Sequence, residues 1–232
     1  MPGNFVNCFR SAHVATTDSR ALRLAVIRTA REMNTLGINR GKSGNVSARI
    51  DGGFLVTPSA LPYEQTAPED IVAVDRDGEA RGRRAPSSEW RFHRDIYAAR
   101  AEVMAIVHAH SPFATTLACL DRGIPAFHYM IAVAGGSDIR CAPYATFGTQ
   151  ALSDAALHAL DGRRACLLAN HGMIAVGSSL ESALALAVEV ETLAEMYWRA
   201  LQVGEPKILP AQEMQIVLER FADYERKEPG VR

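Results

Sequence analysis

Three histidines stand at the ends of two apolar runs and could bind one metal ion. His108 and His110 follow the run 103–107 with a single alanine between them, and His171 closes a second run that begins at Cys166. Residues two apart in a strand point to the same side, so the first two imidazoles can reach an ion at the about 2.0–2.1 Å that zinc prefers. Three histidines would leave one tetrahedral position open, as in a catalytic site. Surface or hydrogen-bonded core histidines are the alternative.

A second group that could do chemistry precedes the histidine pair. Pro86, Ser87, Ser88 and Glu89 form a helix N-terminus signal, because serine oxygens accept from free backbone N–H groups and a carboxylate suits the positive end of the helix dipole. We expect a helix over 87–100 with one apolar face. Hydroxyls and N–H groups at such a terminus can also bind a phosphate dianion.

The loop 40–45 is rich in glycine and runs into a predicted strand. Its Gly41-Lys42-Ser43-Gly44-Asn45 sequence can bring backbone N–H groups close to an anion. It is not a Walker P-loop, because the upstream glycine spacing is missing and a strand follows instead of a helix. An ordinary connecting loop is the alternative. A second hydroxyl-bearing loop, 57–60, follows the predicted hairpin turn at 51–53.

The pattern of apolar residues predicts the elements that must position these groups. We expect helices over 18–36, 87–100, 111–120, 149–160 and 178–203, the last of these opened by a capping box, and a final helix that carries Tyr224. Strands are expected over 45–50, 54–56, 71–75, 103–110 and 166–176, with strand-like segments at 124–130 and 141–148. This mixture predicts one α/β domain over 18–232.

Composition narrows the class of protein further. The chain has 232 residues, of which 48% are hydrophobic and 22% charged, with a net charge of −1. It is long enough for a sizeable core, and the charge balance argues against nucleic acid or an anionic membrane as a partner. Residues 1–17 lack the apolar centre of a secretory signal and are expected to be a flexible tail. The four scattered cysteines indicate reduced thiols and a cytoplasmic protein.

Several short blocks, taken in order, resemble one known family. They are Gly44-Asn45-Val46-Ser47, Thr57-Pro58-Ser59, Pro86-Ser87-Ser88-Glu89, His108-Ala109-His110, His128-Tyr129-Met130, the segment from Ala142 to Gly148, and Asn170-His171-Gly172. Each block is unspecific alone, but their order is similar to that of the class II, zinc-dependent aldolases of the aldolase/adducin family. The resemblance covers 18–224 and is greatest to the members that cleave L-fuculose 1-phosphate.

The resemblance implies a fold, an assembly and a set of roles. The fold would be a three-layer α/β/α sandwich around a mostly antiparallel sheet, assembled as a homotetramer with active sites between subunits. His108, His110 and His171 match the ligands of one Zn²⁺ per subunit, and Glu89 matches the catalytic acid/base, which can be a fourth ligand at rest. The positions that match the phosphate site are Gly44, Asn45, Ser59, Ala60, Ser87 and Ser88. Those that match the aldehyde end in the neighbouring subunit are Tyr129, as proton donor, Phe147 and Tyr224.

One departure concerns the phosphate site. The family member that cleaves L-fuculose 1-phosphate has Thr-Gly where this chain has Ser59-Ala60. Serine keeps the hydroxyl, but alanine has less backbone freedom than glycine, which affects how the loop can fit a phosphate.

The implied activity is the reversible cleavage of a ketose 1-phosphate to dihydroxyacetone phosphate and a short aldehyde. Zinc would act as a Lewis acid on the enediolate, and a carboxylate beside it would move the proton. L-Fuculose 1-phosphate and a 5-deoxy- or methylthiopentulose 1-phosphate are the expected substrates. The alternative is a methylthioribulose-1-phosphate dehydratase or another sugar-phosphate lyase or epimerase of the same family, although its 4-epimerases have aspartate in place of Glu89. A non-catalytic scaffold domain, as in adducin, is the remaining alternative.

Overall fold

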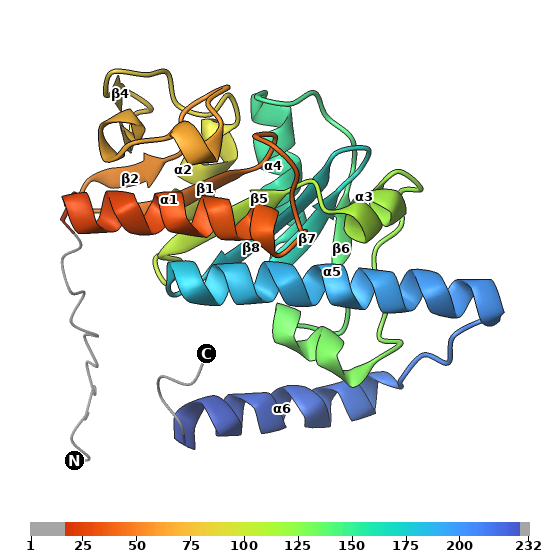
Figure 1. Ribbon diagram of the computed structural model, residues 1–232. Coiled ribbons are helices and arrows are strands. Elements are labelled where there is room, and N and C mark those ends of the chain that lie inside the picture. Colours follow the sequence, from red (N-terminus) through yellow and green to blue (C-terminus); the bar gives the residue numbers. More distant parts are fainter. Residues whose placement is uncertain (1–16, 228–232) are drawn as a thin grey trace, which may run out of the picture.

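The computed structural model of the protein describes residues 17–227, and its centre is an eight-stranded sheet of order β4-β3-β2-β1-β5-β8-β7-β6 (Figure 1). The strands are β1 (Asn45–Ile50), β2 (Gly53–Val56), β3 (Val72–Asp75), β4 (Ala80–Arg81), β5 (Ala105–Ala109), β6 (Arg140–Ala142), β7 (Ala165–Leu168) and β8 (Gly172–Gly177). Only β6 and β7 pair in parallel, and all other neighbours are antiparallel. β5 lies inside the sheet, between β1 and β8.

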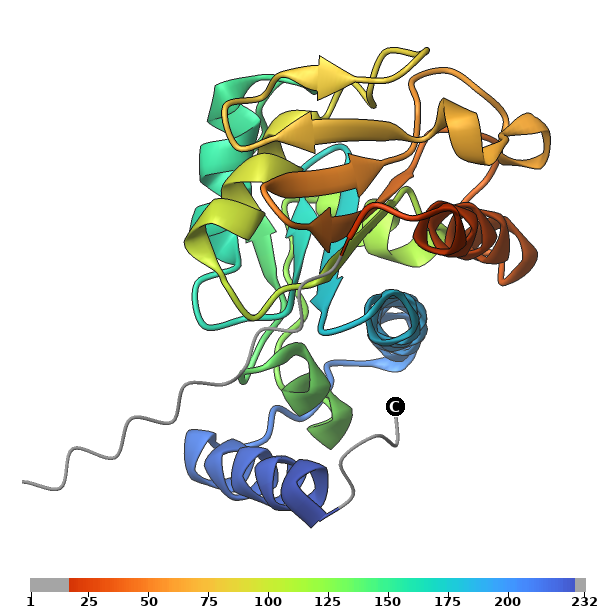
Figure 2. The ribbon, with the colours of Figure 1, turned by 90° about the vertical axis from the view of Figure 1, so that its left-hand side faces the viewer.

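Helices cover both faces of this sheet. The helices within the described residues are α1 (Arg20–Thr35), α2 (Trp90–Ala99), α3 (Pro112–Ala118), α4 (Gln150–Ala159), α5 (Leu180–Val203) and α6 (Ala211–Lys227). Short 3-10 helices are η1 (Tyr63–Gln65), η2 (Pro68–Asp70) and η3 (Tyr129–Ala134), and α6 packs on η3. α1, α3 and α5 lie on one face and α2 and α4 on the other, as the end-on view of α5 in Figure 2 shows. The predicted three-layer, mostly antiparallel α/β/α fold is confirmed.

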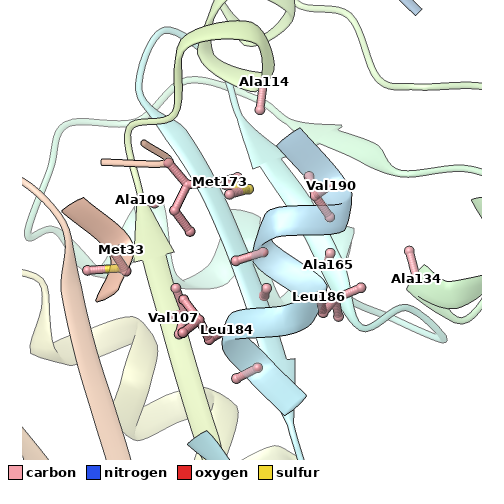
Figure 3. Close-up of a cluster of buried hydrophobic side chains, with 14 of the residues drawn as sticks. Met33, Val107, Ala109, Ala114, Ala134, Ala165, Met173, Leu184, Leu186 and Val190 are labelled. Carbon is pink, nitrogen blue, oxygen red and sulfur yellow. The ribbon is translucent and has the colours of Figure 1, made fainter. Parts of the chain in front are cut away.

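The larger core lies between the sheet and the helices α1, α3 and α5 (Figure 3). Val107 and Ala109 of β5 face it together with Met173 of β8, and Leu184 and Val190 of α5 pack against them. Apolar residues at this density account for the stability of the central strands. These strands therefore give the ends of β5 and β8 a rigid support.

The smaller core lies between the sheet and α2 and α4, and it decides where His108 points. Ile106 of β5 belongs to this core together with Phe92 and Ile96 of α2. Side chains alternate along a strand, so His108 shares the side of Ile106 and faces the layer of α2. His108 is fully buried there.

Some predicted elements differ from the structure. The segment 124–130 forms a single bridge, between Ile124 and Ile139, and then enters η3. Phe127 N–H bonds to the carbonyl of Pro125 two residues back, at 2.7 Å, which turns the chain, and proline has no N–H for a ladder. Of the segment 141–148 only its start belongs to a strand, β6.

Two predicted helix caps are also different. The helix expected from Ser87 begins at Trp90, with Glu89 as a cap residue whose side chain makes no capping bond. The capping box of α5 pairs Ser179 with Ser182, one residue later than the sequence pattern suggested. In both cases the prediction of the helix is correct and only its first residue shifts.

The remaining expectations concern the ends of the chain, its cysteines and the possibility of a membrane span. Residues 1–16, which make up most of the predicted tail, lie outside the described residues, as do 228–232. Cys119, Cys141 and Cys166 are free thiols. None of the helices within 17–227 has the length and apolar character needed to cross a bilayer. The single domain over 18–232 stays a prediction.

Candidate metal centre and active site

Four side chains meet at one point on the α2 side of the sheet. The ligand atoms of Glu89, His108, His110 and His171 all lie within 4.8 Å of one another. His108 Nε2 is 3.0 Å from His110 Nε2 and 3.1 Å from Glu89 Oε2, and His171 Nε2 is 3.1 Å from Glu89 Oε1. Every pair of the three rings is separated by 4.9 Å between centroids, with planes 72–77° apart. The predicted convergence of three imidazoles and one carboxylate is therefore present.

The sheet brings these residues together from distant parts of the chain. His108 and His110 stand at the end of β5, and His171 lies in the tight turn between β7 and β8. β5 and β8 are paired, so the turn lies beside the end of β5. A Cβ on Gly172 would lie 2.5 Å from the Ala109 carbonyl oxygen, so only glycine permits this close approach.

The donor atoms fit a divalent cation. His108 Nδ1–H donates to the Met173 carbonyl at 2.8 Å, which leaves the Nε2 lone pair directed inward, as in metal-binding histidines. Bonds of 2.0–2.1 Å to a tetrahedral zinc separate its ligand atoms by about 3.3 Å, close to the spacing found here. Glu89 Oε1 is buried and has no hydrogen-bond partner among the described residues. A cation would satisfy this oxygen and the facing nitrogens together.

The electrostatics of the cluster also favour a cation. Burial raises the pKa of Glu89, but the facing imidazoles of His108 and His171 outweigh it and hold that pKa below its usual range. Burial, followed by His108 and His171, lowers the pKa of His110 to about 4, so this imidazole is neutral and free to bind a metal. The site thus has a buried negative charge with nitrogen donors around it.

A cleft of about 250 Å³ opens over this cluster and can hold a small molecule. The cluster contributes Glu89, His110 and His171, and the remaining lining residues are Ser43, Ser88, Tyr144, Ala145, Phe147 and Asn170. Phe147 was expected to reach the aldehyde end in a neighbouring subunit, whereas it lines the cleft of its own chain, with 65% of its surface exposed. Sequence reasoning missed Ser43, Tyr144, Ala145 and Asn170, although each lies within a segment that it had singled out. Tyr144 is 63% exposed, which is unusual for an aromatic residue with only a packing function.

The three loops expected to bind phosphate lie side by side. Ser59 N–H donates to the Ala85 carbonyl and Ser87 N–H to the Thr57 carbonyl, both at 3.0 Å. Lys42 Nζ donates to the Ala60 carbonyl at 2.9 Å. The hydroxyl-bearing residues of loops 41–45, 57–60 and 85–88 are thereby held together. Ser59, Ala60 and Ser88 are exposed and can meet a ligand.

Ala60 and Gly44 show why the backbone matters in these loops. Ala60 has φ of +59°, the left-handed conformation in which glycine is favoured, so the departure from Thr-Gly falls where backbone freedom counts. Gly44 is buried, and a Cβ there would lie 2.5 Å from the His108 carbonyl oxygen. Gly44 therefore lets the start of β1 approach the metal-binding strand.

Asn45 lies deeper than the phosphate prediction suggested. It is 2% exposed, and its Nδ2 donates to Glu89 Oε2 at 3.0 Å. Its Oδ1 lies 2.5 Å from His93 Nε2. Sequence reasoning did not single out His93, which is fully buried. The only available signal was its position four residues after Glu89, on the same face of α2.

Tyr129 and Tyr224 do not line the cleft of their own chain. Tyr129 begins η3, is 51% exposed and stacks on Phe221 of α6 with 6.4 Å between ring centroids. Tyr224 is 54% exposed and lines a separate, mainly apolar cleft together with Met130 and Phe221. Their predicted roles refer to a neighbouring subunit and stay predictions.

Known proteins resemble this chain along most of its length. The sequence model of the class II aldolase and adducin N-terminal domain matches residues 24–198. A 5-methylthioribulose-1-phosphate/5-deoxyribulose-1-phosphate aldolase of Rhodospirillum rubrum is 60% identical over 88% of this chain and 92% of its own length. The L-fuculose phosphate aldolase of Escherichia coli strain K12 is 48% identical over 86% of this chain and 93% of its own.

Solved structures agree with the sequence comparisons. An L-fuculose 1-phosphate aldolase superimposes with a TM-score of 0.86 and 40% identity, covering 89% of this chain and 98% of that one. The order of the sheet, the clustered histidines and these matches have one explanation. The chain belongs to the class II aldolase and adducin family.

Proposed function

We propose that the protein is a metal-dependent aldolase that cleaves a ketose 1-phosphate reversibly to dihydroxyacetone phosphate and a short aldehyde. The observation that carries this proposal is the set of three imidazoles and one buried carboxylate in an open cleft. The carboxylate is ionised and lies where it can exchange a proton with a bound molecule. The names of the relatives from Rhodospirillum and Escherichia support the same reaction.

We propose Zn²⁺ as the metal, held by His108, His110 and His171, with Glu89 as a fourth ligand when no substrate is bound. Nitrogen donors favour zinc among the common divalent ions of enzymes. When bound, zinc supplies a Lewis acid that stabilises the negative charge developing as the bond between the third and fourth carbons breaks. In the direction of addition the ionised Glu89 would take a proton from the third carbon of dihydroxyacetone phosphate, and in cleavage the protonated acid would return it to that carbon.

The phosphate would be bound by the three adjoining loops. Ser59, Ser87 and Ser88 offer hydroxyl groups, and the backbone around Gly44 and Ala60 offers N–H groups. Asn45 would act here mainly through its backbone, because both ends of its side chain already have partners. Holding the phosphate fixes the position of the reacting carbons over Glu89.

The aldehyde end would be completed by an adjacent copy of the chain in a homotetramer. Tyr129 and Tyr224 are exposed aromatic residues away from the cleft of their own chain, which supports a function across a subunit boundary. Tyr129 would give a proton to the aldehyde oxygen during addition and take it back during cleavage. Phe147, at the mouth of the cleft, would contact the apolar end of the aldehyde.

Among substrates, we propose a 5-deoxypentulose or 5-methylthiopentulose 1-phosphate, with L-fuculose 1-phosphate as the alternative. The Rhodospirillum relative, at 60% identity, is named for 5-methylthioribulose 1-phosphate and 5-deoxyribulose 1-phosphate. The Escherichia relative, at 48% identity, is named for L-fuculose phosphate. An apolar methyl or methylthio end suits a cleft mouth formed by Phe147 and Tyr144. We also propose that the enzyme works in the cytoplasm, where these free thiols stay reduced.

The test of this proposal incubates a 5-deoxypentulose 1-phosphate, a 5-methylthiopentulose 1-phosphate and L-fuculose 1-phosphate separately with zinc-loaded protein. Dihydroxyacetone phosphate is followed with a coupled NADH-dependent reductase, and the aldehyde by mass spectrometry. We expect triose release from at least one substrate, in proportion to the zinc content. Loss of water without a triose product would assign a dehydratase. Absence of stoichiometric divalent metal would favour a non-catalytic scaffold.

A further inference from the structure

A row of five buried polar side chains connects α2 to β1 beneath the metal cluster. Glu89 caps the start of α2, and His93 and Tyr97 follow it at intervals of four residues, so the three side chains lie along one side of the helix. Asn45 and Ser47 lie two apart on β1 and point to the same side of the sheet, toward that face. All five side chains are buried, with at most 5% of their surface exposed. The two periodicities therefore place five polar groups in one continuous row.

The hydrogen bonds in this row are 2.5–3.0 Å long. Asn45 Nδ2 lies 3.0 Å from Glu89 Oε2, and Asn45 Oδ1 lies 2.5 Å from His93 Nε2. His93 Nδ1 lies 2.7 Å from Ser47 Oγ, which in turn lies 2.8 Å from the Tyr97 hydroxyl. Every polar side-chain atom of the row has a hydrogen-bond partner except Oε1 of Glu89.

The carboxylate fixes the direction of every bond in the row. An ionised Glu89 can only accept, so the Asn45 amide turns its NH₂ toward Glu89 and its oxygen toward His93. His93 must then carry its proton on Nε2 and accept at Nδ1 from Ser47. Ser47, having donated its hydrogen, accepts from Tyr97. One tautomer of His93 is therefore required.

This arrangement selects which oxygen of Glu89 is free to react. Oε2 accepts from Asn45 and faces His108, while Oε1 makes no hydrogen bond and faces His171, a residue that lines the cleft. Phe92 stacks on the His93 ring with 4.6 Å between centroids, and Phe54 lies on it at 6.2 Å, so the ring has little freedom to turn. Asn45 would lose its fixed orientation without the His93 donor, because an amide with one partner can rotate.

We propose that His93 is a positioning residue for Glu89, which it orients through the side chain of Asn45. The proposal rests on the proposed function, since it assumes that Glu89 moves the proton. It predicts that loss of the His93 Nε2–H lowers kcat by about tenfold or more with little change in KM, because a misplaced acid/base costs turnover and not ground-state binding.

Two amide variants at position 93 test whether the Nε2–H group orients Asn45, because both replace the ring by a smaller amide and disturb the packing to a similar extent. His93→Gln places an amide near the position of Nε2, within reach of Asn45, and His93→Asn places one near Nδ1, within reach of Ser47 only. We expect His93→Gln to keep kcat within about fivefold and His93→Asn to lose about tenfold or more, both with full zinc content and an unchanged KM. Equal kcat values for the two variants would overturn the proposal. Tyr97→Phe, in the same row and on the same helix, is the matched control and should stay within about twofold.

A double-mutant cycle separates positioning from a general structural effect. Glu89→Gln removes the group that His93 is proposed to orient, so adding His93→Asn to it should lower kcat by less than about twofold further. A purely structural loss would instead multiply with that of Glu89→Gln, and this result would also overturn the proposal.

The tautomer of His93 can be measured in the wild-type, zinc-loaded protein by 15N NMR, without any variant. We expect the proton on Nε2, and a proton on Nδ1 would contradict the row of bonds even if every variant failed to fold. This readout does not depend on turnover. If no ketose phosphate is cleaved while Nε2 carries the proton, the proposed function fails and the arrangement stands.

Discussion

Replacing Glu89 by glutamine separates metal binding from proton transfer. Glutamine has the same shape, and its amide oxygen can still accept from Asn45 Nδ2 at the 3.0 Å seen for Oε2. The three imidazoles are unchanged, so we expect about one zinc per subunit to remain. General acid/base catalysis contributes about 10²–10⁴-fold to a rate, which corresponds to about 2.7–5.4 kcal/mol of activation free energy. We therefore expect kcat to fall by this factor.

The assay measures zinc by elemental analysis and kcat by triose release on the same preparation. His171→Ala removes one nitrogen donor and should lose both the zinc and the turnover. Glu79→Gln, on an exposed residue between β3 and β4, is the control for charge and should change neither. A glutamine variant of Glu89 with full zinc and turnover within about threefold of wild type would refute the assignment of Glu89 as acid/base.

Three further predictions follow from the geometry. Removal of the metal by a chelator should abolish turnover and lower the Tm in calorimetry, because zinc binds only the folded chain, and added zinc should restore both. Gly44→Ala should lower the free energy of unfolding by about 1–3 kcal/mol in urea titrations, because its Cβ would lie 2.5 Å from the His108 carbonyl oxygen, whereas Gly204→Ala, with no atom within 4 Å, should be neutral. Arg83, with Arg84 and the Ala67 N–H, outweighs burial and holds the pKa of Asp70 well below its usual range. We expect the free energy of unfolding of the wild type to exceed that of Asp70→Asn by about 1 kcal/mol, a modest value because both arginines are half exposed. This difference should be complete above pH about 4 and should decrease as the pH falls toward the lowered pKa of Asp70. Urea midpoints at pH 6, 4 and 3 would show this, and a difference that grows on acidification would contradict it.

The metal cluster was predictable because its signals are local. His108 and His110 share a strand side by their spacing alone, and His171 closes an apolar run before a glycine. That all three meet required the pairing of β5 with β8, which joins residues more than sixty positions apart. Here the order of the motifs, and not their periodicity, supplied the missing information.

The row from Tyr97 to Glu89 was not predictable in the same way. Its members are ordinary polar residues, and their meeting depends on how α2 lies across β1, which no single stretch of sequence encodes. Asn45 was assigned to phosphate from its loop, yet its side chain points inward because β1 pairs with β5 from Asn45 onward. The strand-like segment 124–130 misled for a related reason, since Ile124 and Ala126 are buried in the larger core although the segment adds only one bridge to another strand-like residue.

The position of β5 has a consequence for how the cation leaves the protein. His108 pairs with Asn45 of β1 on one side and with Ile174 of β8 on the other, so it lies in the interior of the eight-stranded sheet. Edge strands and loops open by fraying, but interior strands exchange their amide hydrogens only when the whole domain opens. His108 should therefore stay in place while the cation exchanges through the open cleft past His110 and His171, so that the metal can leave and return without unfolding of the domain.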